Sequence, residues 1–135
     1  MGYKIQEIEG IGPTYGQRLQ DAGMSTTDEL LKACADPKGR KDTAAKTGFS
    51  ESQLLKWANM ADLMRVSGVG EEYSELLEAA GVDTVKELRN RNADNLAEKM
   101  AEVNAQKKLT RAVPSAKTVA KWVEQANTMD PAISY

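Results

Sequence analysis

A glycine-containing segment near the start of the chain occurs a second time, 58 positions later. Residues 8–19, IEGIGPTYGQRL, align with residues 66–77, VSGVGEEYSELL, and the similarity continues downstream of both segments. A repeat of this kind is a supersecondary unit that buries its apolar face against its neighbour. The duplication therefore predicts two related units, at residues 1–65 and 66–135.

Prolines, glycines and capping residues mark helix boundaries throughout the chain, whereas the alternating β-branched pattern of strands is missing. In the first repeat we expect helices at about 13–22, 26–34, 40–47 and 50–64, with a turn at 36–39. In the second repeat we expect helices at about 71–80, 84–89, 92–103 and 115–126. The sequence thus predicts an all-α protein of about eight helices, in which two four-helix units pack into one compact body.

The repeats differ in length. Ser50–Trp57 aligns with Ser115–Trp122 at an offset of 65 rather than 58, so the second repeat has seven additional residues, expected in the helix before Pro114. The two tryptophans hold the same repeat position on apolar helix faces. This placement favours burial in the core over a role in stacking on nucleic-acid bases.

The composition excludes several classes of function. The chain of 135 residues has no histidine, one cysteine and a net charge of −2. We expect no zinc or other metal site, no cofactor and no enzyme activity, because histidine-based catalysis is excluded. The lone Cys34, the lack of an apolar signal core at the N-terminus and the lack of any apolar run of about 20 residues favour a cytoplasmic protein without membrane attachment.

A repeated glycine turn is the strongest functional signal. The first glycine turn is Gly10-Ile11-Gly12 and the second is Gly68-Val69-Gly70; each comes just before an expected helix. Glycine permits positive φ angles and close approach of another backbone. The free N–H groups at the start of a helix attract anions. The turn therefore predicts a place where backbone amides hold a phosphate.

The turns and the residues after them resemble the helix-hairpin-helix motif, in which a small residue and an apolar residue follow at fixed spacing. Gly16 and Leu19 fill those positions in the first repeat, and Ser74 and Leu77 fill them in the second. Over its full length the chain is similar to an uncharacterised bacterial family, domain of unknown function 4332. In DNA-binding proteins with the motif, the turn amides contact backbone phosphates without reading bases. The nucleic-acid-binding residues that this resemblance implies here are Gly10, Ile11, Gly12, Thr14, Gln17 and Arg18.

The second glycine turn departs from the binding pattern. Many binding members carry a lysine just after the turn, whereas this chain has Glu71 and Glu72. Each carboxylate would oppose a phosphate by about 1 kcal/mol even in water, although both favour the start of a helix. We interpret residues 68–70 as a degenerate copy with a structural or protein-binding role, and keep the first turn as the phosphate candidate.

Basic residues outside the turns gather in two clusters. A surface that follows a phosphate backbone could be built from them together with the first turn. The alternative is that they are solvated faces of surface helices. The clusters are Lys38, Arg40, Lys41 and Lys46 in the first repeat and Lys107, Lys108, Arg111, Lys117 and Lys121 in the second. The residues expected to contact nucleic acid are Lys38, Arg40, Lys41, Lys107, Lys108 and Arg111.

Residues 44–54 also resemble a helix-turn-helix, in which Ser50–Lys56 would begin a recognition helix. The alternative is that Gly48 ends one packed helix and Ser50 caps the next.

Taken together, the sequence favours non-catalytic, sequence-independent binding of nucleic acid, with DNA as the expected partner. The competing hypothesis is a protein-interaction or scaffold module that keeps the fold without binding nucleic acid.

Overall fold

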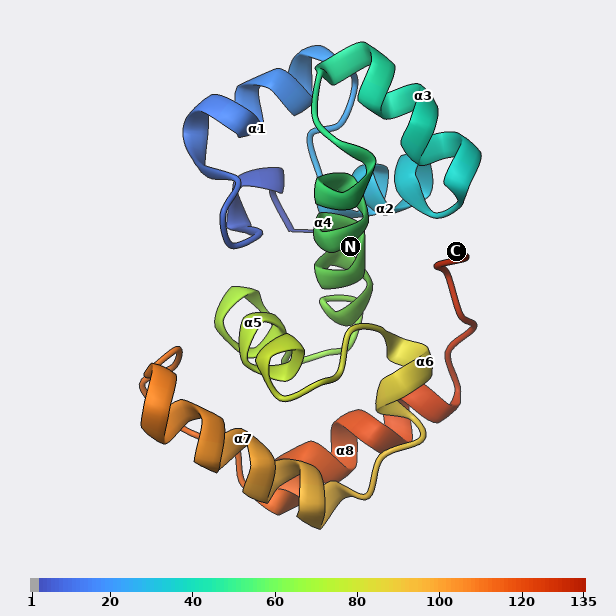
Figure 1. Cartoon of the computed structure of the whole chain (residues 1–135). Helices are drawn as coiled ribbons and strands as arrows, with labels where there is room; N and C mark the ends of the chain where they lie inside the picture. The colour runs from blue at the N-terminus through green and yellow to red at the C-terminus, as the bar shows by residue number, and fades with distance from the viewer. Residues whose placement is uncertain (1–2) are drawn as a thin grey trace.

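The computed structural model describes residues 3–135, which form eight α-helices and one short 3-10 helix, with no strand within this range (Figure 1). The all-α fold class predicted from the sequence is confirmed. The elements are η1 (Ile5–Glu7), α1 (Gly12–Asp21), α2 (Thr27–Cys34), α3 (Pro37–Thr47), α4 (Glu51–Leu63), α5 (Glu71–Ala79), α6 (Val85–Leu88), α7 (Ala93–Lys107) and α8 (Ala116–Asn127).

Short polar side chains begin most of the helices, as the sequence predicts. The hydroxyl groups of Thr26, Ser50, Thr84 and Ser115 each accept a hydrogen bond from a backbone N–H in the first turn of the helix that follows. Such caps satisfy one of the N–H groups that a helix start leaves without a partner. Local sequence therefore sets these boundaries.

The junction between α3 and α4 answers the helix-turn-helix question in favour of simple capping. Gly48 follows α3 with a φ of 82°, and Ser50 accepts from the Gln53 amide. The start of α3 differs from the prediction, because the expected turn at 36–39 is already helical. Asp36 caps the helix and Pro37 takes its first position, where a missing N–H is tolerated.

Two hydrophobic cores lie one above the other along the molecule. The first core contains Ile5, Leu19, Leu30 and Trp57, and the second contains Leu77, Leu88, Met100 and Trp122 with their neighbours. Both tryptophans are buried, as the repeat predicts, at 1% and 3% exposure.

The cores are not confined to the two expected units. Leu63, at the end of α4, belongs to the second core, whereas Ala132 and Ile133 pack against the first. Figure 1 shows α4 running down the middle of the molecule from one core to the other. Contacts therefore cross the expected boundary at residue 65 in both directions.

The C-terminal segment, residues 128–135, returns from α8 to the first repeat and is called the strap below (Figure 1). Its Ser134 amide donates to the Ala35 carbonyl at 2.8 Å, and its Ser134 carbonyl accepts from the Arg40 guanidinium at 2.8 Å. Arg65 donates to the Asp130 carbonyl at 2.9 Å. The strap thus ties the two repeats together.

The additional length of the second repeat is divided between a helix and a connection. Helix α7 has 15 residues and its counterpart α3 has 11. The connection between α7 and α8 covers residues 108–115, whereas only residues 48–50 join α3 to α4. The prediction that placed all seven residues in the helix was therefore only partly right. Across residues 3–135, none of the helices has the length and apolar character required to cross a membrane.

Candidate binding surfaces

The two glycine turns share the backbone of their first glycine but differ at the second, where φ is 63° at Gly12 and −108° at Gly70. Gly10 and Gly68 both have a φ of 91°, and the apolar residues Ile11 and Val69 are buried beneath the turns. The Ile11 and Val69 amides donate to carbonyls three residues earlier, at 3.2 and 3.0 Å. The small residues that follow the turns, Gly16 and Ser74, are also buried, because helix packing there leaves little space.

The first glycine turn is open to solvent. Gly10 is exposed, Gly12 is half-buried, and no heavy atom within 4 Å would obstruct a Cβ at either position. Within residues 3–135 the Gly10 amide has no hydrogen-bond acceptor. Thr14, Gln17 and Arg18 are exposed on α1 beyond it. The turn is thus not covered by the second repeat, and a backbone donor is free at its tip.

The second glycine turn is as exposed at its first glycine as the first turn is, but the groups beside that glycine are bonded to other parts of the chain. The Ser67 amide donates to the Gln125 side chain at 2.9 Å, and the Val69 carbonyl accepts from the Tyr3 hydroxyl at 3.4 Å. The Trp122 indole nitrogen lies 3.2 Å from where a Gly68 Cβ would be. These contacts agree with the interpretation of this turn as a structural copy.

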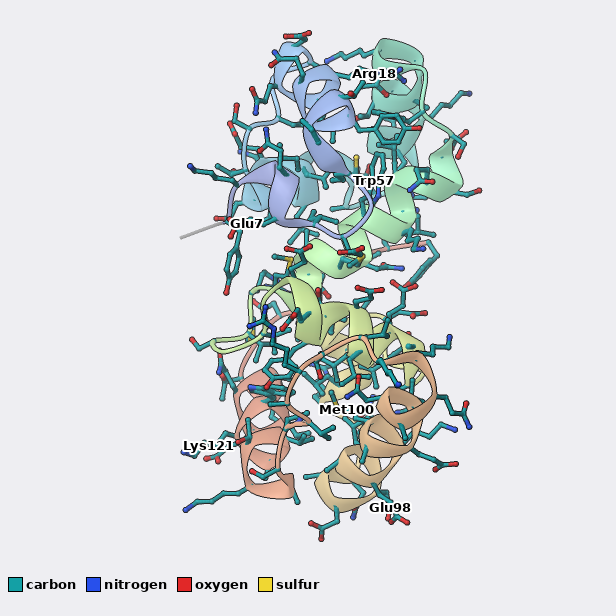
Figure 2. The ribbon with its side chains drawn as sticks, turned by 90° about the vertical axis from the view of Figure 1, so that its left-hand side faces the viewer. Glu7, Arg18, Trp57, Glu98, Met100 and Lys121 are labelled. Carbon is teal, nitrogen blue, oxygen red and sulfur yellow. The ribbon has the colours of Figure 1, made fainter. Side chains whose placement is uncertain are left out.

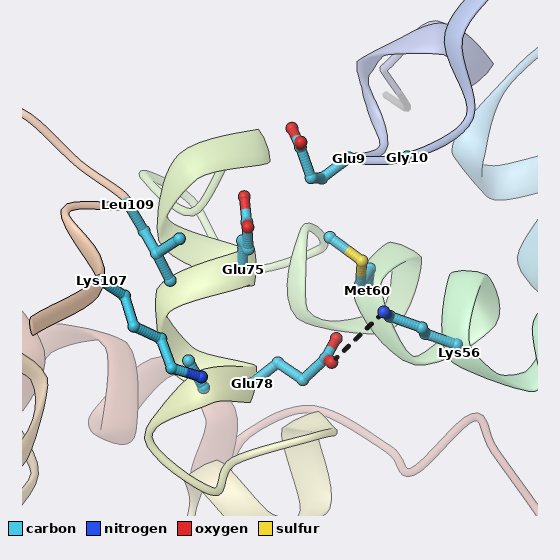
Figure 3. A pocket seen from close by; sticks show the side chains of 9 residues that line it. Glu9, Gly10, Lys56, Met60, Glu75, Glu78, Lys107 and Leu109 are labelled. Atoms are coloured by element: carbon cyan, nitrogen blue, oxygen red, sulfur yellow. Dashed lines mark ion pairs between the residues drawn. The ribbon is translucent and has the colours of Figure 1, made fainter. Parts of the chain in front are cut away.

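The first turn faces a groove between the repeats that is rich in carboxylates. This inter-repeat groove has a volume of about 290 Å³. Figure 3 shows Glu9 and Glu75 facing each other across its mouth, while Lys56 is paired with Glu78. The groove is lined by Glu9, Gly10, Lys56, Met60, Glu75, Glu78, Ala79, Lys107 and Leu109.

The carboxylates near the first turn interact strongly. Partial desolvation and the neighbouring Glu9 carboxylate, with smaller effects from Glu7 and Glu72, raise the pKa of Glu71 from 4.5 to about 7. Partial desolvation and Glu9 also raise the pKa of Glu75. In the described part of the chain, no group of carboxylates is arranged to hold a metal ion. The region beside the free Gly10 amide therefore holds more carboxylates than cations, since only Lys56 and Lys107 line the same groove.

The predicted basic clusters do not surround the first turn. Arg40 is 5% exposed, and its guanidinium donates to the carbonyls of Cys34, Ala35 and Ser134. The prediction that Arg40 belongs to a phosphate-binding surface is therefore wrong, because all of its hydrogen bonds stabilise the fold. Lys38 and Lys41 are exposed on the same helix.

The remaining basic residues lie far from α3. Lys107, Lys108 and Arg111 are exposed at the end of α7 and just after it. Figure 1 shows that end of α7 at the lower left and α3 at the upper right. The two clusters thus do not form one continuous strip, and only Lys107 lines the groove next to Gly10.

An aromatic surface beside α1 was not predicted from the sequence as a site. Tyr15 is 42% exposed and packs edge-on against Phe49, with ring centroids 5.1 Å apart. The Arg18 guanidinium lies 4.6 Å from the Phe49 ring centroid and donates to the Thr47 carbonyl at 3.4 Å. Figure 2 labels Arg18 and Trp57 in this part of the molecule. We call Tyr15, Arg18, Lys46 and Phe49 the Tyr15 face.

The sequence signal for this face was the pairing of Tyr15 with Tyr73 by the repeat. Both rings pack near a tryptophan, at centroid distances of 6.0 and 5.2 Å. The difference in exposure depends on the lengths of two connections far away in the sequence. The spacing of apolar residues along the chain could therefore not predict this difference in exposure.

The fold is thus an all-helical protein with two glycine turns, of which the second is bonded to the side chains of Gln125 and Tyr3. The chain belongs to the family described as Domain of unknown function (DUF4332), whose model matches residues 9–129. Comparison with curated proteins and with solved structures gave no match.

Proposed function

We propose that this chain is a non-catalytic protein-interaction module built on two helix-hairpin-helix turns. The observation that carries the proposal is the convergence of Glu7, Glu9, Glu71, Glu72 and Glu75 around the first glycine turn, whose Gly10 is exposed. A phosphate backbone approaching Gly10 and Gly12 would meet these charges within a Debye length, where salt does not screen them fully. The first glycine turn, whose backbone suits an anion, therefore lies among carboxylates that oppose the binding of phosphate.

Two further features support a protein-binding role. The chain has a net charge of −2, and its exposed basic clusters are split between opposite sides of the molecule. The reactions that need histidine are excluded by the sequence, which has none. The single cysteine, Cys34, is a buried thiol, which fits the cytoplasmic location that we propose.

Sequence-independent nucleic-acid binding is the second candidate. It is favoured by one observation, the exposed Gly10 amide with no acceptor within the described residues. In this alternative the Gly10 and Gly12 amides would hold one phosphate, with Thr14, Gln17 and Arg18 beside it. Lys107, Lys108 and Arg111 would then extend the contact across the inter-repeat groove.

Titration of labelled duplex DNA, single-stranded DNA and RNA at about 50 mM salt separates the candidates, because phosphate contacts are strongest at low salt. We expect no binding by the wild-type chain. Replacing Glu9, Glu71 and Glu75 together by glutamine should then create weak, salt-dependent binding. Binding by the wild type that Gly12→Asp abolishes would favour the nucleic-acid candidate and contradict our proposal.

The protein-interaction role is tested directly by affinity purification after nuclease treatment. We expect a partner protein to be retained in a fixed ratio to the chain. Purification of the chain alone under these conditions, together with DNA or RNA binding in the titration, would reject the proposal.

A further inference from the structure

In the second repeat, a segment of the chain covers the tyrosine that corresponds to Tyr15. In the first repeat, Tyr15 has no such cover. Tyr73, the counterpart of Tyr15, is partly buried and donates from its hydroxyl to the Ala112 carbonyl at 3.2 Å. Ala112 lies in the connection 108–115, and Leu109 of that connection packs against the second core. A non-helical piece of chain with a bend at residues 111–112 therefore lies over the tyrosine in the second repeat.

The connection that covers Tyr73 is held in place by specific bonds. The Asn104 side chain accepts from the Thr110 amide at 2.9 Å and donates to the Thr110 carbonyl at 3.1 Å. The Thr110 hydroxyl donates to the Ala112 carbonyl at 3.0 Å, so the carbonyl that meets Tyr73 is fixed. The cover is an ordered part of the fold.

The first repeat lacks the chain length for such a cover. Only residues 48–50 join α3 to α4, and Phe49 turns inward at 8% exposure. The Tyr15 hydroxyl has no hydrogen-bond partner among residues 3–135, and the ring is 42% exposed. Its position is thus equivalent to that of Tyr73 but is not covered.

Charge next to the face indicates what would cover it. A hollow of about 440 Å³ is lined by Arg18, Asp21, Ala22 and Lys46. Arg18 links the hollow to Tyr15, because its guanidinium carbon lies 5.6 Å from the Tyr15 ring centroid. The Asp21 carboxylate accepts from the Gln17 side-chain amide at 2.9 Å, and across residues 3–135 neither Arg18 nor Lys46 forms an ion pair. The Arg18 guanidinium also lies 4.6 Å from the Phe49 ring centroid, which restricts its position. The hollow therefore suits a carboxylate.

We propose that the Tyr15 face docks a non-helical segment of a partner protein that carries an acidic residue. The segment takes the place that residues 109–114 hold in the second repeat. One of its backbone carbonyls accepts from the Tyr15 hydroxyl, and its carboxylate lies between Arg18 and Lys46. This inference rests on the proposed protein-interaction function and names the chemistry of the partner.

The test uses short random peptides displayed on phage and selected on the full chain. We expect enriched sequences to contain an aspartate or glutamate near proline or apolar residues. A synthetic peptide of the enriched class should lose about tenfold in affinity against Arg18→Gln or Lys46→Gln, because each removes a hydrogen bond to a charged group. Lys46 is exposed, so its replacement leaves folding unaffected.

Matched tyrosine variants give the control. Tyr15→Phe should weaken the peptide about fivefold by removing one hydrogen bond, whereas Tyr73→Phe should leave its affinity unchanged. Amidation of the acidic residue in the peptide should have the same effect as Lys46→Gln.

Three outcomes overturn the inference. Peptides that bind equally well to the Arg18, Lys46 and Tyr15 variants would show another docking site, and the protein-interaction function would stand without this face. Concentration-dependent self-association abolished by Tyr15→Ala would assign the face to a second copy of the chain. Failure to select any peptide, combined with nucleic-acid binding that Arg18→Gln weakens, would reject both the face and the proposed function.

Discussion

Asp62 does in the second repeat what a main-chain carbonyl does in the first. The Thr27 amide donates to the Tyr3 carbonyl at 2.9 Å, and the equivalent Val85 amide donates to the Asp62 carboxylate at 2.8 Å. Asp62 is 1% exposed, and its other oxygen accepts two bonds from Arg65. In the second repeat, a side chain at the end of α4 therefore accepts the hydrogen bond that the Tyr3 carbonyl, just before η1, accepts in the first repeat.

We predict that Asp62→Ala lowers the free energy of unfolding by about 3 kcal/mol, because it leaves the Val85 amide and the Arg65 guanidinium without their partner. Urea denaturation followed by circular dichroism measures the change. Asp42→Ala, at an exposed position on α3, is the control and should change stability little. Equal effects of the two variants would contradict the role assigned to Asp62.

The carboxylates around the first turn predict a pH dependence at the residue scale. The pKa of Glu71 is raised from 4.5 to about 7 by partial desolvation and by Glu9, with Glu7 and Glu72 adding to it. Because the folded state then binds a proton more tightly than the unfolded state, stability should fall as pH rises through this range.

Thermal unfolding between pH 4.5 and 7 checks this prediction. The midpoint temperature should decrease as pH rises, and Glu71→Gln should make the decrease smaller. Glu98→Gln, at an exposed site on α7 far from Glu7 in Figure 2, should leave the slope unchanged. If the midpoint temperature changed equally with pH in the wild type and in both variants, the inter-repeat carboxylates would not be the cause of that change.

At the scale of an element, the connection 108–115 shows how an insertion changes the surface of a repeat. Its order depends on the Asn104 amide, which bonds to both main-chain groups of Thr110. We predict that Asn104→Ala costs about 1–2 kcal/mol and exposes Tyr73, because two hydrogen bonds in a part-buried site are lost.

Hydrogen exchange at the Thr110 amide measures the effect of Asn104→Ala, and exchange there should become faster. Gln106→Ala, at an exposed position on the same helix, is the matched control. Unchanged protection of Thr110 in the Asn104 variant would mean that other contacts hold the connection.

The strap is the second element with a testable role. Arg40 joins it to the end of α2 through three carbonyls, and Ile133 packs against the first core. We predict that Arg40→Gln destabilises the protein by about 2–4 kcal/mol, because buried carbonyls lose charged donors. Lys38→Gln, at an exposed position two residues earlier on α3, should have almost no effect in the same denaturation experiment.

At the scale of the whole molecule, α4 and the strap couple the two cores. Leu63 carries α4 into the second core, and Ile133 returns the C-terminus to the first. We predict a single unfolding transition in which the calorimetric and van't Hoff enthalpies agree. Two resolved transitions would show that the repeats fold independently and that the crossing contacts are weak.

Much of the architecture could be predicted from the sequence, since its signals are local. Caps such as Thr26, Ser50 and Ser115 depend on hydroxyl groups a few residues from the amides they bind. The start of α3 was placed too late, because an Asp-Pro pair is as typical of a helix start as of a turn. The repeat also predicted correctly that both tryptophans are buried.

The candidate site was less predictable from the sequence. Arg40 carries a side chain that often binds phosphate. Its guanidinium, however, donates hydrogen bonds to the carbonyls of residues 34, 35 and 134. Glu9 and Glu75 are distant in sequence and meet only across the groove. Charge clusters read along a chain do not show which side of a folded molecule they occupy.

The sequence by itself determined the helices, the duplicated glycine turns and the apolar positions beneath them, because capping and periodicity act over a few residues. The tertiary structure alone decided which turn is bonded to other parts of the chain, which tyrosine is covered and where charge accumulates. These properties depend on contacts between residues distant in sequence, such as Tyr3 with Val69, Tyr73 with Ala112 and Arg40 with Ser134.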